Sequence, residues 1–404
     1  MQAIDSICFS DACTGCEACC NVCPARCIAM SSDAEGFLAP QIDKDHCTGC
    51  LQCRTQCPAL QAQPQRNAPP DVYACWSLDD AIRMQSSSGG LFSVLAEDIL
   101  LRGGVVFGAL FDETLHVRHD FTETREKLPR FRSSKYVQSE IGDSYRNVRS
   151  FLDRGREVLF TGTPCQIAGL YACPGDLRHH PGLTTCDIVC HGVPSPQVFA
   201  SYVRWLQDKY QRPITGMNMR DKSRSWRPEL LLRIVSPEHS DLLFPSSRDP
   251  FFVGFLKNMF LRPSCHQCRF AREDRPGDWT LADFWGIGNT VPFAHDTQQG
   301  VSLLLVNNDK GRRVFASLKD RLFYERRSLD EAKQGNSMLS RATRPHPNRE
   351  QFFRDYRQLP FDAVVRNHLR PGRRLMKRVK TLLKTILGAR IVSAVRRFRR
   401  SRVS

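Results

Sequence analysis

The stretch CTGCEACCNVCP occupies residues 13–24, and a second stretch, CTGCLQCRTQCP, occupies residues 47–58. Each cysteine of the first stretch that belongs to the repeat returns 34 residues later, and a proline closes both copies. The repeated cysteines are Cys13, Cys16, Cys19 and Cys23, and then Cys47, Cys50, Cys53 and Cys57. A repeat of this kind predicts two equivalent sites in one small N-terminal unit.

The spacing C-x2-C-x2-C-x3-C-P is the ligand run of a bacterial two-cluster ferredoxin, in which the fourth cysteine binds the other cluster. We therefore assign one [4Fe-4S] cluster to Cys13, Cys16, Cys19 and Cys57, and the second to Cys47, Cys50, Cys53 and Cys23. Two zinc sites are the alternative, although zinc modules favour paired C-x2-C knuckles. Cys20 and Cys27 lie outside the pattern, and we interpret them as small buried hydrophobes.

The composition and the N-terminal residues indicate a compartment. Asp5 and Asp11 stand where a secretory signal would carry a basic region followed by an apolar one, and no apolar run reaches roughly 18 residues. We expect a cytoplasmic protein without a spanning helix. In such a reducing compartment the 18 cysteines serve as metal ligands or redox groups more often than as disulfides.

The basic charge is concentrated in a tail. Residues 366–404 contain 14 Lys and Arg and no Asp or Glu, so the other 365 residues carry 44 basic and 42 acidic groups. This nearly neutral body gives no support to nucleic-acid binding. The tail has an apolar and a basic helical face, which suits an anionic membrane surface at the inner face of the membrane; a solvated or partner-bound helix fits equally well.

The Pro- and Gln-rich residues 61–71 form the best linker, and strands alternate with helices beyond it. We predict a two-cluster ferredoxin domain over residues 1–66 and a larger domain over 67–365, divided near residue 160, with the basic tail over 366–404. The fold class is α+β / α/β: a small bacterial ferredoxin-like domain, a larger α/β domain and a basic C-terminal helix. Expected strands lie at residues 105–111, 157–160, 183–189, 229–235, 279–285 and 300–308.

A third thiol set is predicted in the larger domain. Cys165 follows one expected strand and Cys190 the next, so parallel strands would bring both thiols to the carboxyl edge of a sheet. The pair Cys265 and Cys268 is able to close such a site as a further cluster. A zinc site, a reactive Cys165 at a helix N-terminus and a redox dithiol at Cys265/Cys268 remain alternatives.

Two adjacent clusters carry single electrons and do no chemistry on a substrate themselves. Another cofactor must exchange electrons with an organic molecule, and the simplest candidate is a flavin. The run of Ser86, Ser87, Ser88, Gly89 and Gly90 before a helix suits a pyrophosphate, but the same residues also form an ordinary N-cap. The TGTP turn at residues 161–164 is similarly ambiguous. G-x-G-x-x-G and P-loop motifs are both missing from the sequence, so a standard Rossmann nucleotide site is not supported.

Eight segments in order strengthen this interpretation: SSSGGLFSVL, SKYVQSEIGDSYRNVRSFL, VLFTGTPCQIAGL, CDIVCHGVPSP, RDKSRSW, FLRPSCHQCRF, GDWTLADFWGI and GVSLLLVN. The chain strongly resembles the beta subunit family of coenzyme F420 hydrogenases and dehydrogenases, in the version with a fused two-cluster ferredoxin domain. The resemblance covers about residues 10–330.

The resemblance implies an FAD and a third [4Fe-4S] cluster in the larger domain, with Cys165, Cys190, Cys265 and Cys268 as the cluster's ligands. It implies flavin contacts at Ser87, Ser88, Gly89, Gly90, Lys135, Tyr136, Thr161 and Thr163. Asp283 and Trp285 lie in a family motif that we expect near the flavin. The sequence departs from the family pattern at Trp279 and Ala282, where a small aliphatic residue and Gly are expected, and in the basic tail.

The predicted function is an iron–sulfur flavoprotein oxidoreductase that passes electrons between clusters and an organic substrate through FAD. Within the family the substrate is F420 in methanogens, whereas many bacterial members belong to surface-polysaccharide pathways, and the bacterial version is our expectation. The alternatives are an electron-delivery subunit that docks onto a redox partner protein without a substrate of its own, and a metal-stabilised binding protein.

Overall fold

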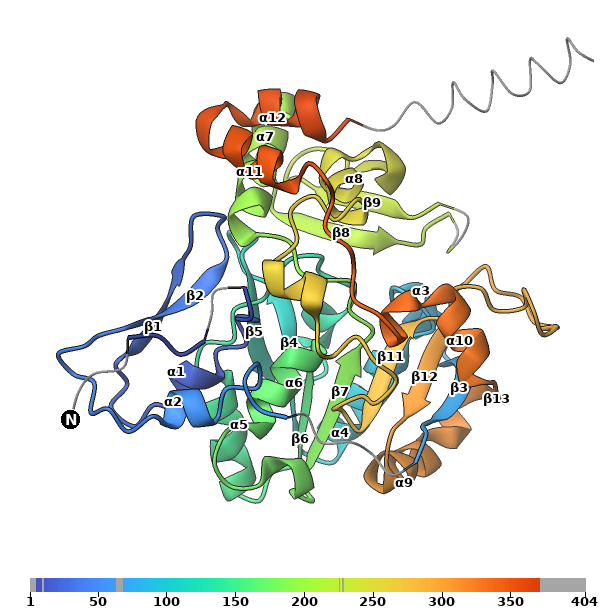
Figure 1. Ribbon diagram of the computed structural model, residues 1–404. Helices are drawn as coiled ribbons and strands as arrows, with labels where there is room; N and C mark the ends of the chain where they lie inside the picture. Colours follow the sequence, from blue (N-terminus) through green and yellow to red (C-terminus); the bar gives the residue numbers. More distant parts are fainter. Residues whose placement is uncertain (1–4, 9–10, 63–67, 225, 227–228, 371–404) are drawn as a thin grey trace, which may run out of the picture.

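The computed structural model describes residues 5–8, 11–62, 68–224, 226 and 229–370 of the 404-residue chain. Three sheets organise them: a two-stranded hairpin, a three-stranded sheet and an eight-stranded sheet. Figure 1 shows the hairpin, in blue, beside the large sheet and the last helices, in red, above it. The predicted α/β class with a small N-terminal unit is confirmed, while most of the predicted basic tail, from residue 371 on, lies outside the described residues.

The N-terminal unit is built on one antiparallel hairpin, β1 (Ile28–Ser32) with β2 (Leu38–Ile42). Two short helices, α1 (Ala18–Val22) and α2 (Gln52–Thr55), each carry part of a cysteine run. The repeat of the sequence is also a repeat of the backbone, because Gly15 and Gly49 have φ angles of 63° and 66°. Only glycine adopts this conformation without steric cost, so each CTGC turn depends on its glycine.

The eight-stranded sheet has the order β13-β3-β12-β11-β7-β6-β4-β5. Its inner strands run parallel to one another: β4 (Val105–Phe111), β6 (Val158–Gly162), β7 (Leu183–Ile188) and β11 (Trp279–Asp283). Antiparallel strands complete both sides: β5 (Val117–Thr122), β12 (Ser302–Val306), β3 (Asp71–Ser77) and β13 (Leu322–Arg326). Because β6 and β7 are parallel, they end at the same edge, as the placement of Cys165 and Cys190 requires.

Helices cover both faces of this sheet because the strand residues alternate between two apolar layers. Val106 and Leu159 face α4 (Leu91–Leu101) and α9 (Asp309–Leu318). Phe107 and Phe160 face α5 (Ser144–Asp153) and α6 (Pro164–Tyr171). The remaining helices at this level are α3 (Asp80–Met84) and α10 (Leu329–Gly335).

A further layer forms a separate core. The three-stranded antiparallel sheet contains β8 (Gly216–Asp221), β9 (Leu231–Val235) and β10 (Leu242–Pro245). It packs with α7 (Pro196–Tyr210), α8 (Pro250–Leu256), α11 (Arg349–Gln358) and α12 (Phe361–His368). The strand expected at residues 229–235 is β9, and it belongs to this sheet rather than to the eight-stranded one. The alternation of strands and helices along the chain does not reveal which sheet a strand joins.

Helix α5 begins later than the spacing of its apolar residues allows. Ile141 has the spacing of the α5 face, and it is buried, but Gly142 has a φ of 54° and α5 begins only at Ser144. The Ile141 amide instead donates to Glu17 Oε1 at 2.7 Å, and that carboxylate also accepts from the Gly142 amide at 2.9 Å. The turn before α5 is thus shaped to hold the N-terminal unit.

Candidate functional site

The eight cysteines of the repeat meet in the two sets that the sequence predicts. One cavity is lined by Cys13, Cys16, Cys19 and Cys57, and the other by Cys23, Cys47, Cys50 and Cys53. Each cavity therefore takes three thiols from one cysteine run and one from the other. This crossing is the ligand arrangement of a two-cluster ferredoxin.

A fifth thiol lies in each of these cavities, which the spacing of the motif does not indicate. Cys27 is buried as expected for a small hydrophobe, but its Sγ also lies 3.5 Å from Cys23 Sγ. Cys8 lines the other cavity, and a hydrogen bond from its thiol lowers the pKa of both Cys13 and Cys57. Since one [4Fe-4S] cluster takes four thiolates, Cys8 and Cys27 are neighbours of the sites beyond the assigned ligands.

The third predicted thiol set converges on one cavity, lined by Cys165, Cys190, Cys265 and Cys268. Cys165 lies in the first turn of α6, directly after β6, and Cys190 follows the end of β7. Cys265 belongs to a 3-10 turn, Pro263–Gln267, and Cys268 ends it. Residues separated by about 100 positions in the sequence thus meet at the carboxyl edge of the sheet.

The chemistry of this cavity fits an iron–sulfur cluster. Burial raises the pKa of Cys165 to about 11 and that of Cys265 to about 12, so without a cation these thiols stay neutral. Metal binding deprotonates thiols, and the metal charge replaces the lost solvation of the thiolates. The Ser264 hydroxyl also lines this cavity; it is buried and has no hydrogen-bond partner in the described structure, so it is available to a bound group.

Across the described part of the chain, no three His, Cys, Asp or Glu side chains gather closely enough to surround a single metal ion. The thiols of each set line the wall of a cavity instead. A cluster requires this arrangement, because each thiolate binds a different iron atom.

The first and third thiol sets lie side by side. Thr14 lines the third cavity, although its neighbours Cys13 and Cys16 line the first. A Cβ on Gly169, in α6, would lie only 3.3 Å from the Cys16 Cβ. The Tyr145 hydroxyl lies 2.9 Å from the Cys16 carbonyl oxygen and 2.8 Å from that of Gln166, which joins the cysteine run to α6.

Arg262 also holds the first cysteine run against the larger unit. Its buried guanidinium donates to the carbonyl oxygens of Cys13 at 3.1 Å and Leu38 at 2.7 Å, and to Gln138 Oε1 at 2.9 Å. Gln138 in turn donates to the Gly15 carbonyl at 3.0 Å. The backbone around Cys13–Cys16 is therefore held rigidly against the larger unit.

The predicted flavin residues fall into two groups. Ser87, Ser88, Gly89 and Gly90 form the turn before α4, where the Ser87 hydroxyl accepts from the Ser134 amide at 2.9 Å. Arg220 Nη1 donates to the Tyr136 hydroxyl at 3.0 Å and Arg220 Nη2 to the Ser87 carbonyl at 3.1 Å, so Tyr136 belongs with the serine turn.

Thr161 and Thr163 lie instead at the end of β6. The Thr161 hydroxyl donates to the Phe107 carbonyl at 3.0 Å, and its own carbonyl contacts His119 Nε2 at 2.9 Å. Thr163 caps α6 beside Cys165. Lys135 belongs with the serine turn, because it follows Ser134, whose amide binds Ser87; the Lys135 Nζ donates to the Arg132 carbonyl at 2.7 Å.

The serine turn is surrounded by buried positive charge, which the sequence patterns did not indicate. Arg83, Arg220 and Lys222 are all buried, and Lys222 Nζ donates to the carbonyl oxygens of Ser88 and Gln299 at 2.6 and 2.7 Å. Asp283 accepts from Arg220 at 2.6 Å. Arg220 and Lys222 belong to RDKSRSW, one of the segments that resemble the family, and this was the signal in the sequence that could have identified them.

Residues of the family motif around residue 283 lie in two places, near the serine turn and in the apolar core. Trp226 Nε1 donates to Asp283 at 2.8 Å, and its ring stacks on Trp285 with centroids 5.0 Å apart. Trp279 is fully buried in the core formed with α4 and α9, where its Nε1 donates to the Gly311 carbonyl at 2.9 Å. The departure from the family pattern at Trp279 is therefore a matter of helix packing.

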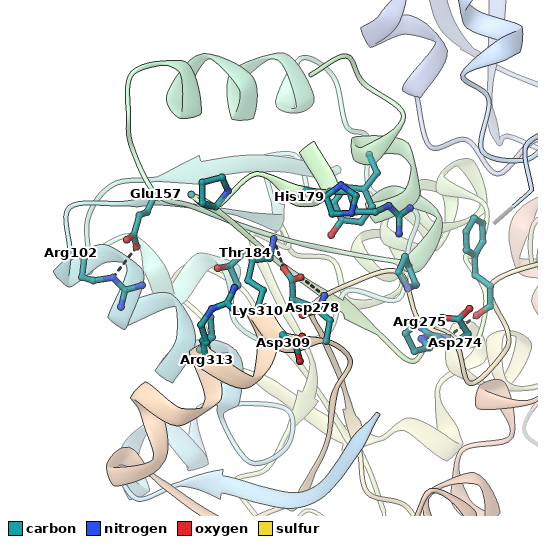
Figure 2. A pocket seen from close by; sticks show the side chains of 18 of the residues that line it. Arg102, Glu157, His179, Thr184, Asp274, Arg275, Asp278, Asp309, Lys310 and Arg313 are labelled. Carbon is teal, nitrogen blue, oxygen red and sulfur yellow. Dashed lines mark hydrogen bonds and ion pairs between the residues drawn. The ribbon is translucent and has the colours of Figure 1, made fainter. Parts of the chain in front are cut away.

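Another cavity, of about 690 Å³, lies at the opposite edge of the sheet (Figure 2). It is lined by residues at the amino ends of strands, such as Glu157, Thr184 and Asp278, and by the start of α9. Its charged groups are largely paired with each other, as Arg102 is with Glu157 at 2.9 Å. None of the site residues predicted from the sequence lies in it.

Two family models match the chain. Residues 12–60 match the 4Fe-4S dicluster domain, and residues 155–332 match the C terminus of the coenzyme F420 hydrogenase/dehydrogenase beta subunit. The chain thus joins a segment similar to the 4Fe-4S dicluster domain to a segment similar to the C terminus of the F420 hydrogenase/dehydrogenase beta subunit. The dicluster match contains all eight cysteines of the repeat, and the beta-subunit match contains Cys165, Cys190, Cys265 and Cys268. This combination describes an iron–sulfur, oxidoreductase-like electron-transfer protein.

Among solved structures, the chain is similar to the F420-reducing [NiFe] hydrogenase complex from Methanosarcina barkeri, with 16% sequence identity and a TM-score of 0.45. The alignment covers 69% of this chain and 92% of the other. Among curated proteins, none matches this sequence significantly. None of the helices in the described residues has the length and apolar character to cross a bilayer.

Proposed function

We propose that this protein, with its dicluster and beta-subunit regions, is an iron–sulfur flavoprotein oxidoreductase. The three cysteine sets would hold three [4Fe-4S] clusters, and the residues around the serine turn would hold FAD. Electrons would pass singly through the clusters and in pairs to or from an organic substrate.

The observation that carries this proposal is the contact between the first and third thiol sets. Thr14 lies in the wall of the third cavity while the adjacent cysteines line the first, and Tyr145 joins both backbones. A binding protein that uses metal only for stability has no need to bring two separate metal sites together in this way. A rigid chain of sites is what electron transfer requires.

The residues present also fit an anionic dinucleotide. The buried guanidinium groups of Arg83 and Arg220 lie at the serine turn with the amine of Lys222, whose pKa burial lowers to about 7, and Asp283 is the carboxylate that pairs with Arg220. This excess of positive charge suits the pyrophosphate of FAD, since a buried charge without a counter-ion is costly. When bound, FAD supplies the exchange between single electrons and electron pairs. The chain's own part is to bind and orient the cofactor through the Ser87–Gly90 turn, Lys135 and Tyr136.

The family match and the resemblance support two candidate substrate classes. The matching family model is named for coenzyme F420 hydrogenases and dehydrogenases, so an F420-like coenzyme is one candidate. An intermediate of a surface-polysaccharide pathway is the other, in keeping with the resemblance to bacterial members of the family.

Anaerobic purification with iron and flavin quantification tests the function. We expect about 12 iron atoms for three [4Fe-4S] clusters and one flavin per chain. Turnover with reduced F420 or NAD(P)H would establish an enzyme. Full cofactor content without any turnover would indicate an electron-delivery subunit instead, and a protein with zinc and no flavin would contradict the proposal.

We expect the affinity for FAD to fall as the pH rises. Desolvation lowers the pKa of Lys135 from 10.5 to about 7, so the free protein loses this positive charge above pH 7. An anionic ligand binds the protonated form better, so the dissociation constant should rise by up to about tenfold per pH unit above 7. Fluorescence titration of flavin-depleted protein with FAD between pH 6 and 9 measures this dissociation constant. The Lys135→Met variant should show a weaker dependence, since burial also lowers the pKa of Lys222 beside the turn, to about 7. Lys319→Met, which removes a lysine that contacts Phe315 and Tyr324, should keep the full dependence; equal slopes in both would contradict the role of Lys135.

The membrane role of the basic tail also remains a proposal. Each Lys or Arg near an anionic surface contributes about 1 kcal/mol, so 14 such residues in 366–404 favour reversible binding. Deleting residues 371–404 should abolish sedimentation with phosphatidylglycerol vesicles and leave the iron content unchanged. Unchanged sedimentation would reject the idea.

A further inference from the structure

The Thr163 hydroxyl contacts a thiol of the third set. Its Oγ1 lies 3.1 Å from Cys165 Sγ, at the point where β6 passes into α6. The family resemblance placed Thr163 among the flavin contacts. Its hydroxyl contacts Gln166 and Cys165 at the start of α6.

The surrounding hydrogen bonds leave the hydroxyl proton for this contact. Thr163 and Gln166 pair at the start of α6, where the Gln166 amide donates to the Thr163 carbonyl oxygen at 2.9 Å and Gln166 Oε1 accepts from the Thr163 amide at 2.9 Å. The Gln166 side chain is buried, and its Nε2 donates to Ser139 Oγ at 2.9 Å, which fixes its orientation. The Thr163 hydroxyl proton therefore points either to Gln166 Oε1, at 3.0 Å, or to Cys165 Sγ, at 3.1 Å.

When Cys165 binds iron, its sulfur becomes the stronger of these two acceptors. Gln166 Oε1 is neutral and already accepts one hydrogen bond. A thiolate that binds iron carries negative charge, and hydrogen bonds to charged acceptors are about twice as strong as neutral ones. The hydroxyl therefore donates to the sulfur when a cluster is present.

We propose that Thr163 is a positioning residue that raises the reduction potential of the third cluster by donating a hydrogen bond to its ligand Cys165. The inference rests on the proposed third cluster. Hydrogen bonds to cluster sulfurs are among the factors that set the potential. A donor stabilises the reduced, more negative state more than the oxidised one, so its loss should make the potential more negative and disfavour electron transfer onto the cluster from the N-terminal pair.

Thr163→Val tests this, because valine keeps the shape of threonine and removes the hydroxyl. In potentiometric titrations followed by electron paramagnetic resonance, we expect the third cluster of the variant to shift its electron-sharing equilibrium with the N-terminal clusters about tenfold, which is a 59 mV decrease for a one-electron couple. Thr163→Ser should restore the wild-type potential. The potentials of the N-terminal clusters should not change.

A matched variant separates this effect from the loss of a helix cap. Ser328 caps α10 by accepting from the Glu331 amide at 3.1 Å, so Ser328→Ala should lose a comparable cap, worth about 1 kcal/mol, without changing any potential. Thr163→Ala serves as a second hydroxyl-free variant.

An unchanged third-cluster potential in Thr163→Val, in a protein with full iron content, would overturn this inference and leave the proposed function standing. Failure of both hydroxyl-free variants to assemble the cluster would also overturn it, because the hydroxyl would then serve assembly instead. Absence of a third-cluster signal in the wild type would overturn both proposals.

Discussion

Replacing Cys165 or Cys190 with alanine should remove the proposed third cluster and interrupt electron transfer to the proposed flavin, while the N-terminal clusters remain. Each of these cysteines is the only one that its strand brings to the third cavity: Cys165 follows β6 and Cys190 follows β7. The iron content should fall by about four atoms per chain. The rate of flavin reduction from the N-terminal clusters should fall by about 100-fold or more, since even changes around metal ligands cost 10- to 100-fold.

Stopped-flow absorption, started by reducing the N-terminal clusters with a low-potential ferredoxin, measures this rate together with the spectra of the clusters. Cys173→Ala is the matched control. Cys173 follows α6, on which Cys165 lies, and its half-buried thiol donates to the Gly169 carbonyl at 3.6 Å, but it lines none of the thiol cavities described above. Wild-type flavin reduction in Cys165→Ala would show that the electrons take another route.

Asp187→Ala should cause the largest loss of stability among single substitutions near the site. Asp187 and Arg275 are almost completely buried, and Asp187 Oδ1 accepts from Arg275 Nη2 at 2.9 Å and Nε at 3.1 Å. The other carboxylate oxygen accepts from the Gly277 amide at 2.8 Å. Removing one member of a buried pair leaves an uncompensated charge and costs about 3–5 kcal/mol.

The pair also connects the two sides of the third thiol set. Asp187 lies in β7, three residues before Cys190, and Arg275 lies seven residues after Cys268 and lines the cavity itself. Arg275 further donates to the Phe270 carbonyl at 2.8 Å. Without Asp187, Arg275 should hold the segment that carries Cys265 and Cys268 less firmly. Loss of third-cluster iron is therefore expected as a second consequence.

Hydrogen exchange of the β7 amides in the anaerobic protein measures the free energy of opening without requiring reversible unfolding. Asp153→Ala is the control, because it breaks a half-exposed pair with Arg149 that should contribute only about 0.3–0.5 kcal/mol. The double variant Asp187→Leu with Arg275→Met should be less destabilised than Asp187→Ala, because no buried charge is left alone. Equal protection in Asp187→Ala and Asp153→Ala would contradict the assignment of a buried, unscreened pair.

Local features of the structure were predictable where neighbouring residues decide them. The strands at residues 105–111 and 300–308 and the helix after the serine turn follow from apolar patterns and turn residues, and all are present. The start of α5 was not predictable from periodicity. Ile141 keeps the helical spacing of its apolar neighbours, but its amide bonds to Glu17, which is more than 120 residues away in the sequence.

The site shows the same division. The crossing of Cys23 and Cys57 between the two cavities was predicted because the repeat limits where each thiol can reach. The positions of Cys8 and Cys27 beside the ligand sets were not, since both lie outside the repeated spacing. The cations Arg83, Arg220 and Lys222 also escaped notice, because they come from separate segments that meet only when β8 packs against the turn before α4.

The sequence alone determined the two N-terminal thiol sets, because runs of 12 residues place cysteines on tight turns whose geometry depends only on local backbone bonds and a glycine with positive φ. Only the tertiary structure decided that Cys165, Cys190, Cys265 and Cys268 line one cavity and that Thr14 reaches it. Their convergence depends on the parallel order of β6, β7 and β11, which is selected by burying the apolar faces of the whole sheet against helices from distant parts of the chain.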